Sequence, residues 1–269
     1  MPVVNTNVES LQAMQALRGT QRLMEKSMVA LSTGQRINSA ADDAAGMAIS
    51  HKLTSQIRGL NQAVRNANDA ISMLQTADGA SGSISDMLVR MRELSVQSAN
   101  GTYSSADQSA INAEFVDLRD ELGRVISNTT WNGNHILNSS GSVVFQVGHT
   151  SADGLTVQFD NLSALSEISA VMAFSAASAS GVLSGIDDAI RVIDHQRASW
   201  GAVISRLGHA ADNALNIALN TSASRSRIQD TDYAQTTAEL ARAQILQQAG
   251  TAMLSQANQR PAYVLALLR

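Results

Sequence analysis

The chain has 269 residues, no cysteine and a formal net charge of −4 at pH 7. This composition excludes a disulfide framework, a thiol nucleophile and a thiolate metal site, and the charge offers no basic surface for nucleic acid or an anionic membrane. Only two Trp, three Tyr and four Phe are present, and the two prolines lie at the extreme ends of the chain. Small side chains and a long proline-free interior predict a mainly α-helical, elongated rod with thin helix-on-helix contacts.

The sequence contains no targeting or membrane signal of the usual kind. No run of about 18 apolar residues occurs, so we expect no transmembrane span and no membrane insertion. The N-terminus, MPVVNTNVES, lacks the basic and apolar regions of a cleavable signal peptide. We therefore expect either a cytoplasmic protein or export by a route that needs no such signal.

The first helical pattern begins near Asn5 and stops at Thr33-Gly34, where glycine tolerates the left-handed conformation. Its apolar residues recur in steps of three and four. They are Met14, Leu17, Met24, Met28 and Leu31.

A second helix is predicted to start at Ser39 as its N-cap, with Asp42 and Asp43 in the first turn. From Leu53 to about Asn100 it keeps the heptad spacing of a coiled-coil seam. The expected seam positions are Ile57, Leu60, Val64, Ala67, Ile71 and Leu74, followed by Ile84, Leu88, Met91 and Leu94. A third helix is expected from Ser105, with Gln108 completing a capping box, to about Asn128.

A small β region follows the third helix. The segment 129–141 is rich in Asn, Gly and Ser and is predicted to be a loop. Two short alternating runs, 143–147 and 155–159, then predict a β-hairpin near residues 143–159.

Two further helices complete the prediction. A long seam begins at Ile186 and passes Ile190, Ile193, Arg197, Trp200, Ile204 and Leu207 before it ends near Ala218. We expect Arg197 to lay its stem along that seam with its charge at the edge. The last helix begins near Asp230 or Asp232. Its apolar residues fall on several faces and include Ala238, Ala241, Ile245, Ala249, Leu254 and Ala257.

A helix that is apolar on several faces must be surrounded, and the first helix can cover only one side. Ala-rich helices bury little apolar surface, so the free energy gained from burial hardly offsets the backbone entropy lost when they fold. We therefore predict that both terminal helices are disordered in the monomer and fold when other copies supply the missing faces.

Three stretches of the sequence resemble motifs of bacterial flagellins. They are LSTGQRINSAADDAAGMAI at 31–49, RMRELSVQSANGT at 90–102 and SRIQDTDYAQTTAELARAQILQQAGTAMLSQANQ at 226–259. The ending Leu267-Leu268-Arg269 is also typical of that family. Their order along the chain matches the family, so the resemblance covers nearly the whole sequence.

The resemblance implies a structural subunit that self-assembles into the helical flagellar filament used for motility. Residues 1–42 and 232–269 would pair as the terminal coiled coil of the inner tube, and residues 43–231 would form the helical outer-tube domain. No large variable outer domain is expected between about Asp160 and Gly185. The positions predicted to pack between subunits are Met14, Leu17, Met24, Met28, Leu31, Ala238, Ala241, Ile245, Ala249 and Leu254.

The resemblance also implies partners. They are other copies of the chain, an export chaperone, the filament cap and the hook-junction proteins, with secretion by the flagellar export apparatus. Residues 29–50 match a segment sensed by plant immune receptors. Arg90, Leu94 and Glu114 match positions contacted by the flagellin-sensing Toll-like receptor of animals; subunit packing is the alternative role for these three residues.

The sequence shows no enzyme, cofactor site or metal site. Its five histidines form no i, i+4 pair and no HExxH motif, and no phosphate-binding glycine loop occurs. The pairs Asp42-Asp43 and Asp187-Asp188 are interpreted as charges of first helical turns. The alternatives to a filament subunit are a hook–filament junction protein, a flagellin-like cell-surface binding protein or adhesin and, least favoured, a membrane-active amphipathic protein.

Overall fold

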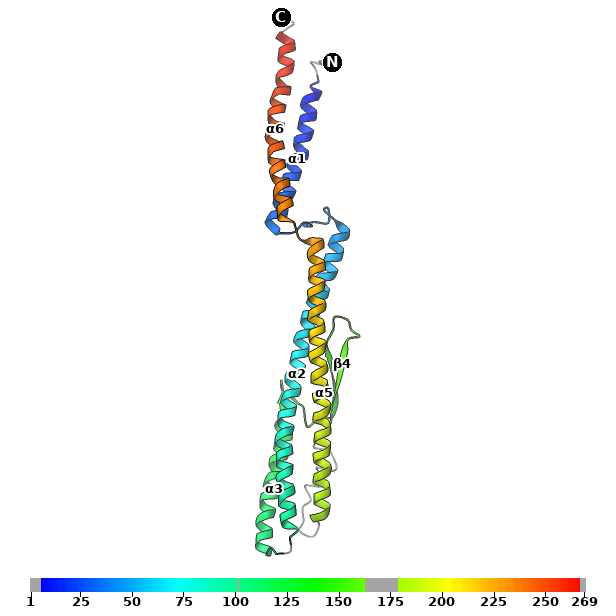
Figure 1. Ribbon diagram of the computed structural model, residues 1–269, viewed down its shortest axis with the longest axis vertical. Helices are drawn as coiled ribbons and strands as arrows, with labels where there is room; N and C mark the ends of the chain where they lie inside the picture. The colour runs from blue at the N-terminus through cyan, green and yellow to red at the C-terminus, as the bar shows by residue number, and fades with distance from the viewer. Residues whose placement is uncertain (1–5, 101, 163–178, 267–269) are drawn as a thin grey trace. The chain divides into compact units, whose positions relative to one another are not determined.

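The computed structural model describes residues 6–100, 102–162 and 179–266 (Figure 1). Within these residues the helices are α1 (Val8–Thr33), α2 (Ala44–Ser98), α3 (Ser105–Asn128), α5 (Ala179–Gln229) and α6 (Tyr233–Ala266). The strands are β1 (Thr130–Trp131), β2 (Asn134–His135), β3 (Gly141–Gln146) and β4 (Gly154–Phe159). The fold is therefore mainly α with a small β region, as predicted.

The chain divides into two compact units. The central unit is Gln56–Leu219, and the terminal unit combines Met1–Ser55 with Asn220–Arg269. Long-range contacts in the terminal unit join α1 to α6, which confirms the predicted pairing of the terminal helices. The pair is antiparallel, because Asn7 donates to the carbonyl of Ala257 at one end and Thr231 donates to the carbonyl of Gly34 at the other.

The core of the central unit is a coiled-coil seam between long helices. On α2 every position in steps of three and four from Leu60 to Ser98 is buried. These positions are Leu60, Ala63, Ala67, Ala70, Leu74, Ala77, Ser81, Ile84, Leu88, Met91, Ser95 and Ser98. The same core includes Phe115 and Leu122 of α3, Trp200 of α5 and Phe159 of β4. The ring centroids of Phe159 and Trp200 lie 5.7 Å apart.

On α5, two of the predicted seam positions are wrong. Ile193 and Trp200 are buried as expected, but the residues buried between them and beside them are Ala189 and Gln196 rather than Ile190 and Arg197. The amide of Gln196 can be buried because it donates to the carbonyl of Gln158, 3.1 Å away. Arg197 lies at the edge, as predicted, where its Nε is 2.8 Å from Asp78.

The helix ends confirm one prediction and correct three others. Gly34 caps α1 in the left-handed conformation, with φ 70°. The N-cap of α2 is not Ser39, because α2 begins at Ala44 and Asp43 accepts from the backbone of Gly46 at 2.9 Å.

The other two corrections concern α3 and α5. The capping box of α3 is formed by Ser104 with Asp107, one residue earlier than predicted. The helix expected from Ile186 begins at Ala179 and continues through the polar segment 221–227 to Gln229.

The predicted hairpin is confirmed, with β3 and β4 antiparallel and Val143 opposite Val157. The preceding segment 129–141 is not only a loop, because β1 and β2 form a second, two-residue hairpin there. Its turn is Asn132-Gly133, with φ 48° and 81°. Asn-Gly is the residue pair that such tight turns favour, so this turn was readable from the sequence.

Candidate subunit-assembly surface

The seam between α1 and α6 consists mainly of small side chains. Its buried residues are Ser10, Ser27 and Ala30 on α1, and Thr236, Ala243 and Ala257 on α6. With Gly250, the α6 positions recur every seven residues, which is the repeat of a coiled coil. A Cβ on Gly250 would lie 2.7 Å from Leu17 Cδ2, so the two helices approach closely at this glycine. The seam therefore brings the backbones together but buries little apolar volume.

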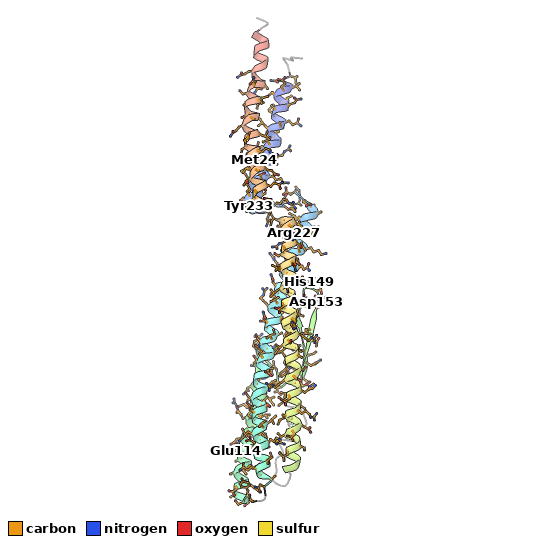
Figure 2. All side chains as sticks on the ribbon, in the orientation of Figure 1. Met24, Glu114, His149, Asp153, Arg227 and Tyr233 are labelled. Atoms are coloured by element: carbon orange, nitrogen blue, oxygen red, sulfur yellow. The ribbon has the colours of Figure 1, made fainter. Side chains whose placement is uncertain are left out.

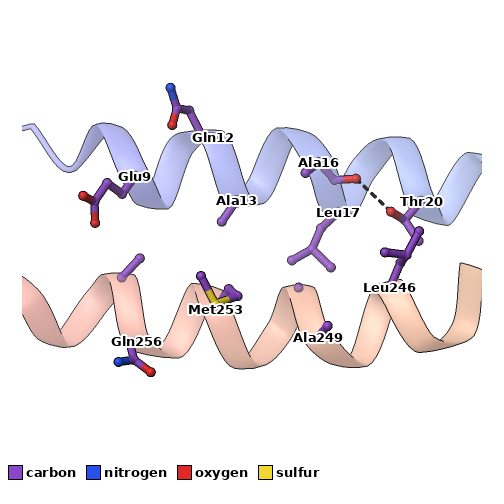
Figure 3. Close-up of a pocket in the computed structure, with 12 residues that line it drawn as sticks. Glu9, Gln12, Ala13, Ala16, Leu17, Thr20, Leu246, Ala249, Met253 and Gln256 are labelled. Atoms are coloured by element: carbon purple, nitrogen blue, oxygen red, sulfur yellow. Dashed lines mark hydrogen bonds between the residues drawn. The ribbon is translucent and has the colours of Figure 1, made fainter.

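A groove runs along one edge of this helix pair. The cavity has a volume of about 680 Å³, and Figure 3 shows its lining residues projecting from both helices. Leu17 of α1 and Leu246 and Met253 of α6 provide the large apolar side chains. Gln12 and Gln256 are among its polar lining residues.

Many large apolar side chains of the terminal unit are exposed. The most exposed are Ile245 at 66% and Met253 at 65%, both on α6. The others are Val8, Leu11, Met14, Leu23, Met28, Val29, Ile49, Tyr233 and Leu246. Single exposed apolar residues are ordinary, but a gathering of this kind on two helices marks an interaction surface.

The predicted packing residues fall into two groups in the structure. Leu17, Met24, Leu31 and Leu254 are half-buried, and Leu17 lies against Gly250 in the α1–α6 seam. Met14, Met28, Ala238, Ala241, Ile245 and Ala249 are exposed and are free to meet another chain. Five further seam residues were not among the predicted packing positions: Ser10, Ser27, Thr236, Ala243 and Gly250. The seven-residue repeat of small residues on α6 was the available signal.

The segment that follows α1 pairs with the segment that precedes α6, and together they form a joint at this end of the helix pair. Gln35 and Asp230 form an isolated antiparallel bridge, and the backbone N–H of Arg36 donates to the carbonyl of Gln229 at 2.7 Å. The guanidinium of Arg36 donates to the carbonyl of Ile228, also at 2.7 Å. Tyr233 closes this joint, because a Cβ on Gly34 would lie 3.1 Å from its hydroxyl. These bonds fix the relative positions of α1 and α6 at one end of the pair.

Asp42 ties the same joint to α1. Its carboxylate lies 3.1 Å from Lys26 Nζ and accepts from the backbone N–H and the hydroxyl of Ser39, each at 3.0 Å. The hydrogen bond from Lys26, followed by those from Ser39, lowers the pKa of Asp42 from 3.8 to about 2. The carboxylate therefore stays ionised throughout the physiological pH range.

The three residues matched to an immune receptor do not share one environment. Arg90 is exposed and pairs with Glu114 at 2.8 Å and with Glu93 at 3.1 Å (Figure 2 labels Glu114). The hydrogen bond that Arg90 donates to the Glu114 carboxylate is the main cause of the raised pKa of Arg90. Leu94 is 1% exposed and belongs to the central core. Of the three residues, Arg90 and Glu114 have exposed side chains in the single chain, and the receptor contact stays a prediction.

The described part of the chain contains neither a cluster suited to a metal ion nor a helix suited to a membrane. No group of three or more His, Asp or Glu side chains there could hold a metal ion. Among the same residues, no helix has both the length and the hydropathy that a membrane crossing requires.

Models of known protein families match an N-terminal and a C-terminal stretch of the chain. Residues 4–142 match the bacterial flagellin N-terminal helical region, and residues 183–268 match the bacterial flagellin C-terminal helical region. The chain belongs to the bacterial flagellin family. It is accordingly a structural subunit of the flagellar filament, which is extracellular.

Individual flagellins match over nearly their full length. A flagellin of Halalkalibacterium halodurans is 40% identical over 275 positions that cover 99% of this chain and 100% of the relative. Flagellin B of Vibrio cholerae is 35% identical over 371 positions that cover 98% of this chain and 99% of the relative. The second alignment is more than a hundred positions longer than this chain, which is therefore a short form.

A solved structure agrees with this assignment. The crystal structure of Bacillus cereus flagellin superimposes with a TM-score of 0.51 at 33% identity, and it covers 56% of this chain and 88% of that one. None of these findings favours a junction protein or an adhesin.

Proposed function

We propose that the chain polymerises through the outward faces of α1 and α6. In this assignment residues 1–42 and 232–269 form the inner tube of the filament, and residues 43–231 form the outer tube. The observation that carries the proposal is the row of exposed apolar residues on two helices whose shared seam buries mainly small side chains. Covering that row with further copies removes apolar surface from water, which favours association.

Single-residue changes test this assignment without disturbing the monomer. Ile245 is 66% exposed, so Ile245→Glu removes no buried contact of the single chain. We expect it to abolish seeded filament growth, because a carboxylate between packed helices would be buried without a partner. Gln75→Glu on α2 adds the same charge at an exposed position of the central unit and is the matched control.

Electron microscopy after salt-induced seeding is the readout. Long tubes from the Gln75→Glu chain and none from the Ile245→Glu chain support the proposal. Equal growth of both variants would show that the α6 face does not carry polymerisation.

We extend the proposal to partners implied by family membership. Before assembly, an export chaperone would cover the apolar faces of α6, the flagellar export apparatus would secrete the chain, and the cap and hook-junction proteins would bound the filament. A host receptor would contact the exposed pair Arg90 and Glu114. In every one of these roles the chain acts as a structural protein, and we propose no catalytic activity for it.

A further inference from the structure

The methionines of the two units differ in exposure. In the described part of the chain, the strongly exposed ones are Met14, Met28 and Met253, all in the terminal helices. Met73 and Met91 of α2 are buried in the central core. Thioether oxidation follows exposure, so an oxidant in solution reaches the terminal methionines first.

Met253 is the most exposed of these methionines and occupies a defined place. It lines the α1–α6 groove beside Leu246 and Gly250, and Figure 3 shows its side chain projecting from α6 into the groove. A methionine in such a place fills irregular gaps between packed helices, because its side chain is flexible and polarisable.

We propose that Met253 is an oxidation site that controls polymerisation. A peroxide or hypohalous acid transfers one oxygen atom to the sulfur in the unassembled chain. The thioether becomes a sulfoxide and is oxidised by two electrons. Hydrogen peroxide is reduced to water in this step, and a hypohalous acid is reduced to the halide. This inference rests on the proposed function, since its effect is on assembly through α6.

The sulfoxide opposes assembly for a physical reason. Its oxygen is a strong hydrogen-bond acceptor that water satisfies while the groove is open. When an apolar face of another copy covers the groove, that oxygen loses water and must find a donor. The Thr20 hydroxyl of the groove already donates to the carbonyl of Ala16. The side-chain amides of Gln12 and Gln256 are exposed to water in the single chain, so either one would have to give up its hydration to pair with the sulfoxide.

Assembly should in turn protect the site. In a filament held together by this face, Met253 is covered and the oxidant has no access to its sulfur. Oxidation before assembly and oxidation after assembly therefore have different outcomes, which a general chemical lesion would not produce.

The experiment uses the full-length chain and dilute hydrogen peroxide. Peptide mass mapping gives the oxidised fraction of each methionine, and seeded assembly gives the critical concentration. We expect Met253 to be oxidised well before Met73 and Met91 in the monomer, and the critical concentration to rise by about tenfold. Methionine sulfoxide reductase should reverse the rise, and preformed filaments should show slower oxidation at Met253.

Three variants assign the effect to this residue. Because Met14 and Met28 are also exposed, the test compares the double variant Met14→Leu with Met28→Leu and the triple variant that adds Met253→Leu. Leucine keeps an apolar side chain that peroxide does not oxidise, so treatment should raise the critical concentration of the double variant and leave that of the triple variant the same, whatever its untreated value. Met253→Gln places a polar side chain of similar length there and should raise the critical concentration without peroxide.

The outcomes separate the two proposals. If the treated double variant keeps its critical concentration, or if the treated triple variant loses assembly as much as the double variant, Met253 is not the controlling site and the inference is overturned. It is also overturned if Met253 is oxidised no faster than the buried methionines. If the untreated natural chain makes no filament on its own seeds, the proposed function fails instead.

Discussion

Both units of this molecule pair helices through a heptad repeat, but the side chains at the repeat positions differ in size. In the central unit the seam of α2 carries Leu74, Leu88 and Met91 against aromatic partners, and these residues are fully buried. In the terminal unit the same repeat carries Ser27, Ala243 and Gly250, and large apolar residues point outward. A heptad repeat thus predicts that two helices pair, but the size of the seam residues determines whether the pair is stable alone.

This difference bears directly on function. Large seam residues complete a core within one chain, whereas small ones let two helices pair and leave their bulky residues for other copies. A structural subunit that must exist both alone and in a polymer needs both kinds of seam. We therefore expect the stability of the terminal unit to depend on assembly.

The largest expected effect on stability comes from replacing one leucine in each of the two seams. Leu88 is 0% exposed, so Leu88→Ala should destabilise the central unit by about 2–5 kcal/mol through lost contacts and a cavity. Leu17 is half-buried in the terminal seam, and Leu17→Ala should leave the central unit unchanged.

Tryptophan fluorescence during urea unfolding measures this difference, because Trp131 and Trp200 are the two tryptophans of the chain and both lie in the central unit. The midpoint should fall for Leu88→Ala and stay constant for Leu17→Ala. Equal shifts would mean that the two units unfold as one.

Hydrogen exchange sharpens the same contrast without any substitution. In a dilute monomer, amides of α1 and α6 should exchange at least about a hundredfold faster than amides of α2 beside Leu88, because local opening is cheap where little apolar surface is buried. In the filament the difference should shrink. Strong protection of α1 in the monomer would disprove our prediction that the terminal helices are disordered before assembly.

Local signals explain what the sequence predicted well. The stop at Gly34, the hairpin at 143–159 and the start of α6 after Asp232 each depend on residues close together in the chain. Competition between neighbouring caps explains the error at α2. Ser39 and Asp43 are both good N-caps, and Asp42 engages Ser39 in the joint, which leaves Asp43 to cap the helix.

Long-range contacts explain what the sequence could not predict. Gln196 lies in the seam because a carbonyl 38 residues away accepts its amide hydrogen, and nothing near Gln196 in the sequence announces that partner. The outward apolar residues of the assembly surface, such as Met28 and Ile245, were predictable as a surplus that one partner helix cannot cover. For the seam itself, the seven-residue repeat of small residues on α6 was a signal, whereas Ser10 and Ser27 of α1 carry no hydrophobic pattern.

A smaller effect separates two glycines of the terminal helices. Gly19 has open space where a Cβ would be, so Gly19→Ala should stabilise α1 by about 0.5–1 kcal/mol through helix propensity. Gly250→Ala gains the same propensity, but its methyl group would lie 2.7 Å from Leu17. The difference between the two variants therefore isolates the cost of crowding the seam, about 1–3 kcal/mol.

Thermal unfolding of the filament, in which both terminal helices are folded, measures this pair by far-ultraviolet circular dichroism. The midpoint should rise for Gly19→Ala and be lower for Gly250→Ala than for Gly19→Ala. Equal gains in both variants would show that Leu17 turns aside freely and that the close approach at Gly250 is not required.

The smallest effect concerns Asp42 and the joint beside α1. Its pKa is lowered from 3.8 to about 2, so the ionised form is favoured in the folded chain. The stabilisation from this carboxylate is present above pH 4 and is lost as the pH falls through about 2, because protonation removes its bond to Lys26.

NMR titration of the Asp42 side-chain carboxyl carbon should give a midpoint near 2 in the natural chain. Lys26→Gln should move the midpoint upward, toward 3.8, since the largest cause of the shift is gone. Arg22, exposed on the same helix, offers the control Arg22→Gln, which removes one positive charge and should leave the Asp42 midpoint in place. An equal movement in both variants would assign the shift to the general positive charge of α1 rather than to the Lys26–Asp42 contact.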